Sequence, residues 1–191
     1  MSASPALSAL RRATVADHAA LEHEAEIESR LTDPSTRAAT VAAFHRFHAA
    51  VEATAHPAVA ALDGPFRPRS RAEGIARDLI ALGMTPQTVS SSLRTISTGA
   101  ALGWVYVAEG SMLGGRIIRK RLTAAGADLH GLTFLDPYGD QTGERWRAFL
   151  ALLDQACADG AATVDDIVRG GVEAFAFARQ ILTPQPEEAA A

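Results

Sequence analysis

Residues 106–120 read YVAEGSMLGGRIIRK and carry Gly110, Gly114 and Gly115 inside a segment with helical periodicity. Each glycine within a helix costs about 1 kcal/mol relative to alanine, so the segment loses about 3 kcal/mol of helix propensity. Gly110 and Gly114 are four residues apart and share one face, which therefore exposes backbone. Such a face allows either a close crossing with another helix or the approach of a flat ligand, and the spacing alone leaves both open.

The rest of the chain shows the same pattern, because apolar residues recur every three to four positions and alternating, strand-like runs are scarce. This periodicity predicts an all-α protein without a sheet. The motif DPST at 33–36 is expected to start the second helix, and Pro57 to bend or end it, because proline removes a backbone donor. Helices are predicted over residues 4–29, 36–62, 71–82, 98–124, 143–158 and 163–183.

The segments between these helices differ in composition. GPFRPRSR at 64–71 is predicted as a loop, and TPQTVSSSL at 85–93 as a connection or a short helix. Residues 126–143 are dense in glycine, aspartate and proline, which predicts a long ordered loop with at most a short helix. Long loops in compact domains tend to be functional. Thr163 and Asp166 have the spacing of a capping box at the start of the last helix.

Composition limits the class of protein. The chain has 191 residues, of which 48% are apolar, a size typical of one globular domain with a core large enough to enclose a ligand. We expect this domain over residues 1–184 and a disordered tail over 185–191. A net charge of -4 gives no general basic field for nucleic acid or anionic lipid. No membrane span or signal peptide is visible, so a cytoplasmic location is expected. The single cysteine, Cys157, is expected to be a packing residue.

The first predicted helix carries a histidine within its apolar stripe. Glu22 lies one turn after His18 and can accept a hydrogen bond from one ring nitrogen, which would orient the other nitrogen toward a metal. A structural histidine paired with a carboxylate has the same spacing, so the residues leave both roles open. The stripe, at steps of three and four, consists of Leu7, Leu10, Thr14, His18, Leu21 and Ala25.

Basic residues accompany both segments. Arg11 lies two turns before His18 on the same face, where it can meet a ligand carboxylate or solvent. RIIRKR at 116–121 follows the glycines near a helix end, where cations stabilise the helix dipole and where one of them could face a carboxylate ligand. His45 and His48 form an H-x-x-H pair, but the sequence motifs that accompany such histidines in di-iron bundles are lacking.

Taken together, two motifs resemble the heme oxygenase family, in particular its bacterial, biliverdin-producing branch often found beside bacteriophytochromes. LRRATVADHAALE at 10–22 is similar to the family's pattern around the proximal haem ligand. LGWVYVAEGSMLGGRII at 102–118 is similar to the pattern of its distal helix. The resemblance spans most of residues 7–183 and implies a multi-helix fold in which haem lies between the first, proximal helix and a glycine-rich, kinked distal helix.

On the proximal side, the resemblance implies that His18 is the axial ligand of the haem iron and that Glu22 orients its ring. It also implies contacts of the haem propionates with Arg11 and Tyr106, and with Lys120 as a further basic residue. The arrangement of these last residues is similar to the one that gives alpha cleavage of the ring.

On the distal side, Ser111 stands where eukaryotic members of the family carry an aspartate that anchors a water, whereas the bacterial branch tends to have serine. His48 and Trp146 match, by spacing, a distal histidine linked to ordered water and an aromatic residue near that water. The residues that the resemblance places against the distal haem face are Gly110, Ser111, Gly114 and Gly115.

The resemblance further implies that haem b is both substrate and prosthetic group. With O2 and external electrons, it is cleaved to biliverdin IX-alpha, CO and ferrous iron. The electrons would come from a ferredoxin, a flavoprotein reductase or ascorbate, since the chain has no flavin or nicotinamide motif, and a bacteriophytochrome would accept the biliverdin. The alternatives are a non-enzymatic haem-binding or trafficking protein on the same scaffold, and a helical di-iron oxidase of the same fold.

Overall fold

The computed structural model describes residues 4–87 and 96–184, and this part of the chain is helical, with no strand. The predicted all-α class is therefore confirmed. Of the predicted connection at 85–93, residues 88–93 lie outside the described residues, as does the predicted tail at 185–191. The elements are α1 (Pro5–Ala25), α2 (Ile27–Thr32), α3 (Pro34–Thr54), α4 (His56–Ala60), α5 (Ala72–Ala81), α6 (Thr98–Ala124), η1 (Thr133–Leu135), η2 (Gly139–Gln141), α7 (Thr142–Ala158) and α8 (Val164–Leu182).

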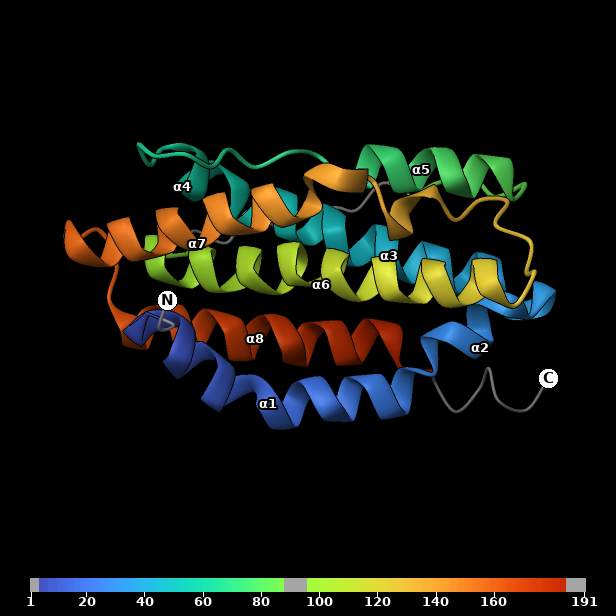
Figure 1. Cartoon of the computed structure of the whole chain (residues 1–191), viewed down its shortest axis with the longest axis horizontal. Coiled ribbons are helices and arrows are strands. Elements are labelled where there is room, and N and C mark those ends of the chain that lie inside the picture. Colours follow the sequence, from blue (N-terminus) through green and yellow to red (C-terminus); the bar gives the residue numbers. More distant parts are fainter. Residues whose placement is uncertain (1–3, 88–95, 185–191) are drawn as a thin grey trace.

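Helix α6 runs through the middle of the molecule (Figure 1). Helix α8 packs against both α6 and α1, and these three helices run in the same direction, whereas α3 and α7 run the opposite way. None of the described helices is both long enough and apolar enough to cross a membrane.

The helix starts follow local sequence signals. Ser4, Asp33, Ser97 and Thr163 each accept a hydrogen bond from a backbone N–H in the first turn that follows, which satisfies a donor without an intrahelical partner. The predicted start at DPST is confirmed, with Asp33 as the cap and Pro34 in the first turn. The predicted cap at Thr163 is confirmed as well, at 3.1 Å from its oxygen to the Asp166 nitrogen.

The predicted first helix, 4–29, is wrong at its C-terminal end. Glu26 adopts a left-handed conformation with φ 44°, and α2 begins after it in a new direction. The Arg30 side chain donates to the carbonyl of Ala25 at 3.2 Å and also to the carbonyl of Leu182. A long-range contact with the end of α8 therefore holds this break, and the local sequence carries no signal for it.

Glycines bring three helices into close contact. A Cβ at Gly103 of α6 would overlap with the Ile167 carbonyl of α8, and a Cβ at Gly170 would overlap with the Ala100 carbonyl. A Cβ at Gly171 would lie 2.6 Å from Leu10 Cδ2 of α1. Helix α8 therefore meets α6 backbone to backbone and meets α1 at Leu10.

The predicted loop at 126–143 is confirmed as ordered, with only the short turns η1 and η2. The buried carboxylate of Asp78 accepts hydrogen bonds from the backbone N–H of Thr133 at 3.1 Å and of Phe134 at 2.8 Å, and from the Thr133 hydroxyl at 2.8 Å. These bonds fix η1 against α5. The hydrophobic cluster below it contains Leu31, Val41, Ile75, Leu79, Leu122, Leu132, Phe134 and Leu135.

Candidate functional site

His18 lies on α1 with its side chain 58% exposed, while the neighbouring stripe residues Leu10 and Thr14 are buried. Its Nδ1 is 3.5 Å from Glu22 Oε2, as the spacing predicts. Its ring meets the Phe175 ring of α8 edge-on, with centroids 5.7 Å apart. With Nδ1 directed to a carboxylate, Nε2 is the nitrogen left for a ligand, and the carboxylate makes that nitrogen more basic.

Arg11 and Tyr106 lie together where α1 passes α6. The side chains of Arg11 and Thr14 lie close enough to the Tyr106 hydroxyl to influence its pKa. Burial raises the pKa of Tyr106, and the nearby Arg11 guanidinium acts in the opposite direction. The structure therefore brings two of the predicted propionate contacts to one point, a phenol and a cation that suit a carboxylate.

The positions of His18 and Gly110 along their helices can be compared from this contact. His18 lies four residues beyond Thr14 on α1, and Gly110 lies four residues beyond Tyr106 on α6. Each step is a rise of about 6 Å, and α1 and α6 run in the same direction (Figure 1). His18 and Gly110 therefore each lie one turn beyond the place where Thr14 approaches Tyr106.

The three predicted distal glycines do not face the same surroundings. A Cβ at Gly110 would lie 3.8 Å from the Trp146 ring, and one at Gly114 would meet nothing within 4 Å. A Cβ at Gly115 would overlap with the Leu135 carbonyl of η1. Packing against η1 thus accounts for Gly115, and we leave it out of the proposed haem-facing set as a correction to the sequence interpretation.

Ser111 uses its hydroxyl within its own helix, where it donates to the Ala108 carbonyl at 2.7 Å. Such a bond to the preceding turn competes with the helix hydrogen bonds and tends to bend the helix. Ser111 therefore stands beside Gly110 as a residue that shapes α6.

Apolar side chains next to these residues remain outside the core. Leu113 is 37% exposed and Ile117 is 54% exposed on either side of Gly114, and Val15 of α1 is 65% exposed. Exposed apolar groups around bare backbone fit a flat apolar ligand. Within residues 4–87 and 96–184, no group of three or more His, Cys, Asp or Glu residues could hold a metal ion. A single histidine therefore suits iron whose other ligands come from a macrocycle, so the residues present fit haem.

Lys120 lies away from the other predicted propionate contacts. It borders a surface hollow of about 600 Å³ together with Arg116 and Arg119. Along α6 it is 14 residues beyond Tyr106, a rise of about 21 Å. Because this separation exceeds the reach of a lysine side chain, Lys120 does not join Arg11 and Tyr106, and we leave it out of the proposed propionate site.

His48 lies buried on α3, with 2% of its surface exposed, and its Nε2 has no hydrogen-bond partner among the described residues. Burial holds its pKa well below the ordinary value, and the positive charge of Arg71 acts in the same direction. His48 is therefore neutral at physiological pH. A neutral ring with a buried nitrogen that lacks a protein partner fits a water-binding role.

Replacement of His48 by glutamine is expected to flatten the pH dependence of stability. The unfolded chain takes up a proton near the ordinary histidine pKa of 6.5, whereas the folded chain keeps His48 neutral. The free energy of unfolding of the wild type should therefore fall as the pH drops below that value, by up to about 1.4 kcal/mol per pH unit for this group. Urea unfolding between pH 8 and 5 measures the slope.

The exposed His23 on α1 provides a matched control for the loss of one histidine, through His23→Gln. An equal slope in wild type and His48→Gln would show that His48 has no part in the pH dependence.

A buried ionic network between α6 and α7 was not predicted from the sequence. Arg145 of α7 pairs with Glu109 of α6 at 3.0 Å, and both side chains are nearly buried. The guanidinium of Arg145 also lies 4.4 Å from the centre of the Tyr138 ring, and that of Arg71 lies 5.3 Å from it. Arg71 in turn contacts Met112 of α6 and donates to the Phe134 carbonyl.

One sequence signal for this network exists. Glu109 shares a helix face with apolar Val105 and Met112, and a charge on an apolar face indicates a buried partner. The identity of the partner, Arg145, depends on how α7 packs and has no local signal.

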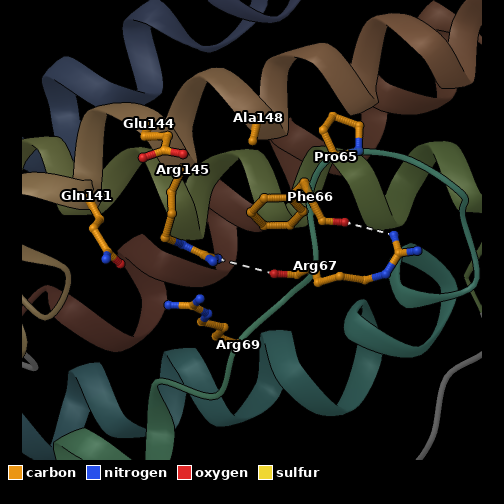
Figure 2. A pocket seen from close by; sticks show the side chains of 8 residues that line it. All are labelled: Pro65, Phe66, Arg67, Arg69, Gln141, Glu144, Arg145 and Ala148. Atoms are coloured by element: carbon orange, nitrogen blue, oxygen red, sulfur yellow. Dashed lines mark hydrogen bonds between the residues drawn. The ribbon is translucent and has the colours of Figure 1, made fainter.

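The hollow in Figure 2 lies between α7 and the 65–69 loop, with a volume of about 400 Å³. None of the predicted site residues lines it. Arg145 extends from its wall, where it donates to the Arg67 carbonyl at 3.4 Å as well as to Glu109. This hollow therefore leads from the surface to the buried ion pair.

Trp146 connects the two sides of α6. Its ring centre lies 5.7 Å from that of Tyr106 and 5.8 Å from that of Phe149. Together with its proximity to Gly110, this places the predicted aromatic residue at the candidate site.

Comparison with known proteins gives consistent matches. The family model described as heme oxygenase matches residues 4–184. A heme oxygenase of Xanthomonas campestris pv. campestris is 32% identical over 137 residues, which cover 71% of this chain and 82% of that protein. Heme oxygenase PigA of Pseudomonas aeruginosa is 34% identical over 90 residues, 45% of each chain.

A solved structure agrees with the fold. The NO- and CO-bound heme oxygenase from Neisseria meningitidis superposes with a TM-score of 0.73 at 27% identity, covering 91% of this chain and 87% of that one.

Proposed function

The chain belongs to the heme oxygenase family of haem-degrading oxidoreductases, and we propose that it cleaves haem b to biliverdin, CO and ferrous iron with His18 as the axial ligand. The observation that supports this most is that the His18–Glu22 pair follows Thr14 by one turn on α1 while Gly110 follows Tyr106 by one turn on α6, with Thr14 and Tyr106 close together. When bound, haem supplies both the ring that is cleaved and the iron at which O2 is activated. The protein supplies the ligand, the orientation and the surroundings.

On the proximal side, His18 Nε2 binds the iron, and Glu22 holds the opposite ring nitrogen. Because this hydrogen bond fixes the tautomer, the ligating nitrogen stays unprotonated. Phe175 supports the ring edge-on from α8.

At the edge of the site, Arg11 and Tyr106 bind a haem propionate. Their contact fixes the rotation of the ring in its plane, which decides the meso carbon that faces Gly110. We propose alpha cleavage, in line with the resemblance, and propose biliverdin IX-alpha as the product.

On the distal side, Gly110 and Gly114 would let the α6 backbone approach the ring, while the Ser111 hydroxyl stays bonded to the Ala108 carbonyl. A backbone wall this close excludes water and limits the directions open to a small ligand. His48 Nε2 would hold a water that can pass on a proton, and Trp146 would close the distal space beside Gly110.

The external partners follow from the reaction. Electrons come from a ferredoxin, a flavoprotein reductase or ascorbate. Use of the biliverdin by a bacteriophytochrome, a cytoplasmic location and a haem-binding domain that comprises residues 1–184 remain predictions.

Titration of the purified protein with haem, followed by a reductant under air, tests this proposal. We expect a histidine-ligated Soret band that gives way to the absorbance of biliverdin, with the isomer identified by chromatography. Haem that binds but stays intact under O2 and reductant would instead indicate a haem-trafficking protein. Absence of haem binding would remove the proposal.

A further inference from the structure

Helix α8 presents three residues, spaced four apart, to α1. Gly171 makes room for Leu10, and Phe175 meets the His18 ring. The third residue, Arg179, lies one turn beyond Phe175. All three contacts therefore act on the helix that carries His18.

Arg179 holds α1 on both sides of His18. Its Nη2 and Nε donate to the two carboxylate oxygens of Glu24 at 2.7 and 3.2 Å, a bidentate pair. Its Nη1 lies 3.7 Å from Asp17 Oδ1. Asp17 directly precedes His18. Glu24 lies seven residues after Asp17, which is two turns, so both carboxylates are on the same side of α1.

A second arginine fastens the end of α1. Arg30 of α2 donates hydrogen bonds to the carbonyls of Ala25 and Leu182, the last residues of α1 and α8. With its end tied to α8 here, the remaining freedom of α1 is rotation about its axis. The bidentate contact of Arg179 with Glu24 opposes this rotation.

Small rotations matter at the ligand. The imidazole lies about 6 Å from the helix axis, so a rotation of about 10° moves it by about 1 Å. A displacement of this size at a reacting centre is enough to change a rate.

We propose that Arg179 is a positioning residue that sets the rotation of α1 and hence the direction in which His18 presents its ligating nitrogen. This inference rests on the proposed function, because it takes His18 as the haem ligand. The structure assigns the role through Glu24 and Asp17, with no contact between Arg179 and His18 itself required.

Three variants and a matched control test the role. Arg179→Met removes both contacts, Glu24→Gln weakens the bidentate one, and Arg179→Lys keeps the charge without the planar fork. Arg169→Met is the control, since Arg169 lies on the same helix and pairs with Asp166 of α8 itself.

The readouts are the iron–histidine stretching frequency of the ferrous complex, the haem dissociation constant and the ratio of biliverdin isomers. We expect Arg179→Met to shift or broaden the stretching band, to raise the dissociation constant by about tenfold and to alter the isomer ratio. Arg179→Lys should fall between it and wild type, and Arg169→Met should match wild type. If Arg179→Met fails to fold, Arg179→Lys and Glu24→Gln carry the test.

Hydrogen exchange in the haem-free protein provides an independent readout. Amides of α1 around His18 should exchange faster in Arg179→Met, while those of α6 should not change. The double variant Glu24→Arg with Arg179→Glu should restore slow exchange and, with haem, the stretching band.

The outcomes separate the two proposals. Wild-type protein that shows no histidine-ligated haem spectrum would overturn the proposed function, while the exchange experiment still reports on the hold of Arg179 on α1. Wild-type spectra and wild-type exchange in Arg179→Met would overturn the Arg179 inference and leave the haem oxygenase proposal in place.

Discussion

Replacement of His18 by alanine is expected to abolish the histidine-ligated haem spectrum and the formation of biliverdin. The two histidines of α3, His45 and His48, are buried and so do not replace it. Haem affinity should fall by more than about 100-fold, since loss of a metal ligand costs more than loss of its hydrogen-bond partner. Absorbance titration and single-turnover assays with a reductant under air measure both effects.

Two further variants provide a control and an intermediate case for the His18→Ala experiment. His23→Ala removes an exposed histidine from the same helix and should leave spectrum and turnover unchanged. Glu22→Gln keeps the ligand but weakens the hydrogen bond to Nδ1, so it should give an intermediate loss. A His18→Ala protein with the wild-type Soret band would show that another group binds the iron.

Replacement of Gly110 by leucine is expected to leave the protein folded and to reduce haem turnover by about 100-fold, or to change the biliverdin isomer. The added Cβ meets only the Trp146 ring at 3.8 Å, an ordinary contact, so the helix tolerates it. The rest of the leucine side chain extends into the space between α6 and the proposed haem plane. It would hold the ring away from the backbone or turn it in its plane.

Gly110→Ala is the matched control because it adds the Cβ alone. It should raise stability by about 1 kcal/mol through helix propensity and keep most of the turnover. Circular dichroism, thermal unfolding and product chromatography separate folding from activity. Normal turnover and isomer ratio in Gly110→Leu would assign the glycine to helix packing.

The three glycines of the motif in α6 have different surroundings, and the sequence predicted only part of this difference. Spacing predicts that Gly110 and Gly114 share a face, and their surroundings agree with an open face. Gly115 is next in the same motif, but a Cβ there would meet the Leu135 carbonyl of a loop held by Asp78. Nothing local to the glycine motif indicates where that loop packs, so the motif alone does not separate Gly115 from Gly110 and Gly114.

The helix-crossing glycines and the buried charges share this limit. Gly103 and Gly170 decide how closely α6 and α8 approach, yet neither stands in a motif that reveals its partner. The pairing of Glu109 with Arg145 joins residues 36 positions apart in the chain. Such contacts depend on the packing of whole helices, which periodicity does not specify.

Local chemistry explains what the sequence determined by itself. Helix starts, the end of α3 shortly before Pro57 and the His18–Glu22 pair depend on residues within one or two turns, so their spacing along the chain is sufficient. The contact of Arg11 with Tyr106, the buried Nε2 of His48 and the contacts of Arg179 with α1 were decided by tertiary structure. Each of these depends on the distance and rotation between two helices, and that geometry arises only when side chains from distant parts of the chain pack together.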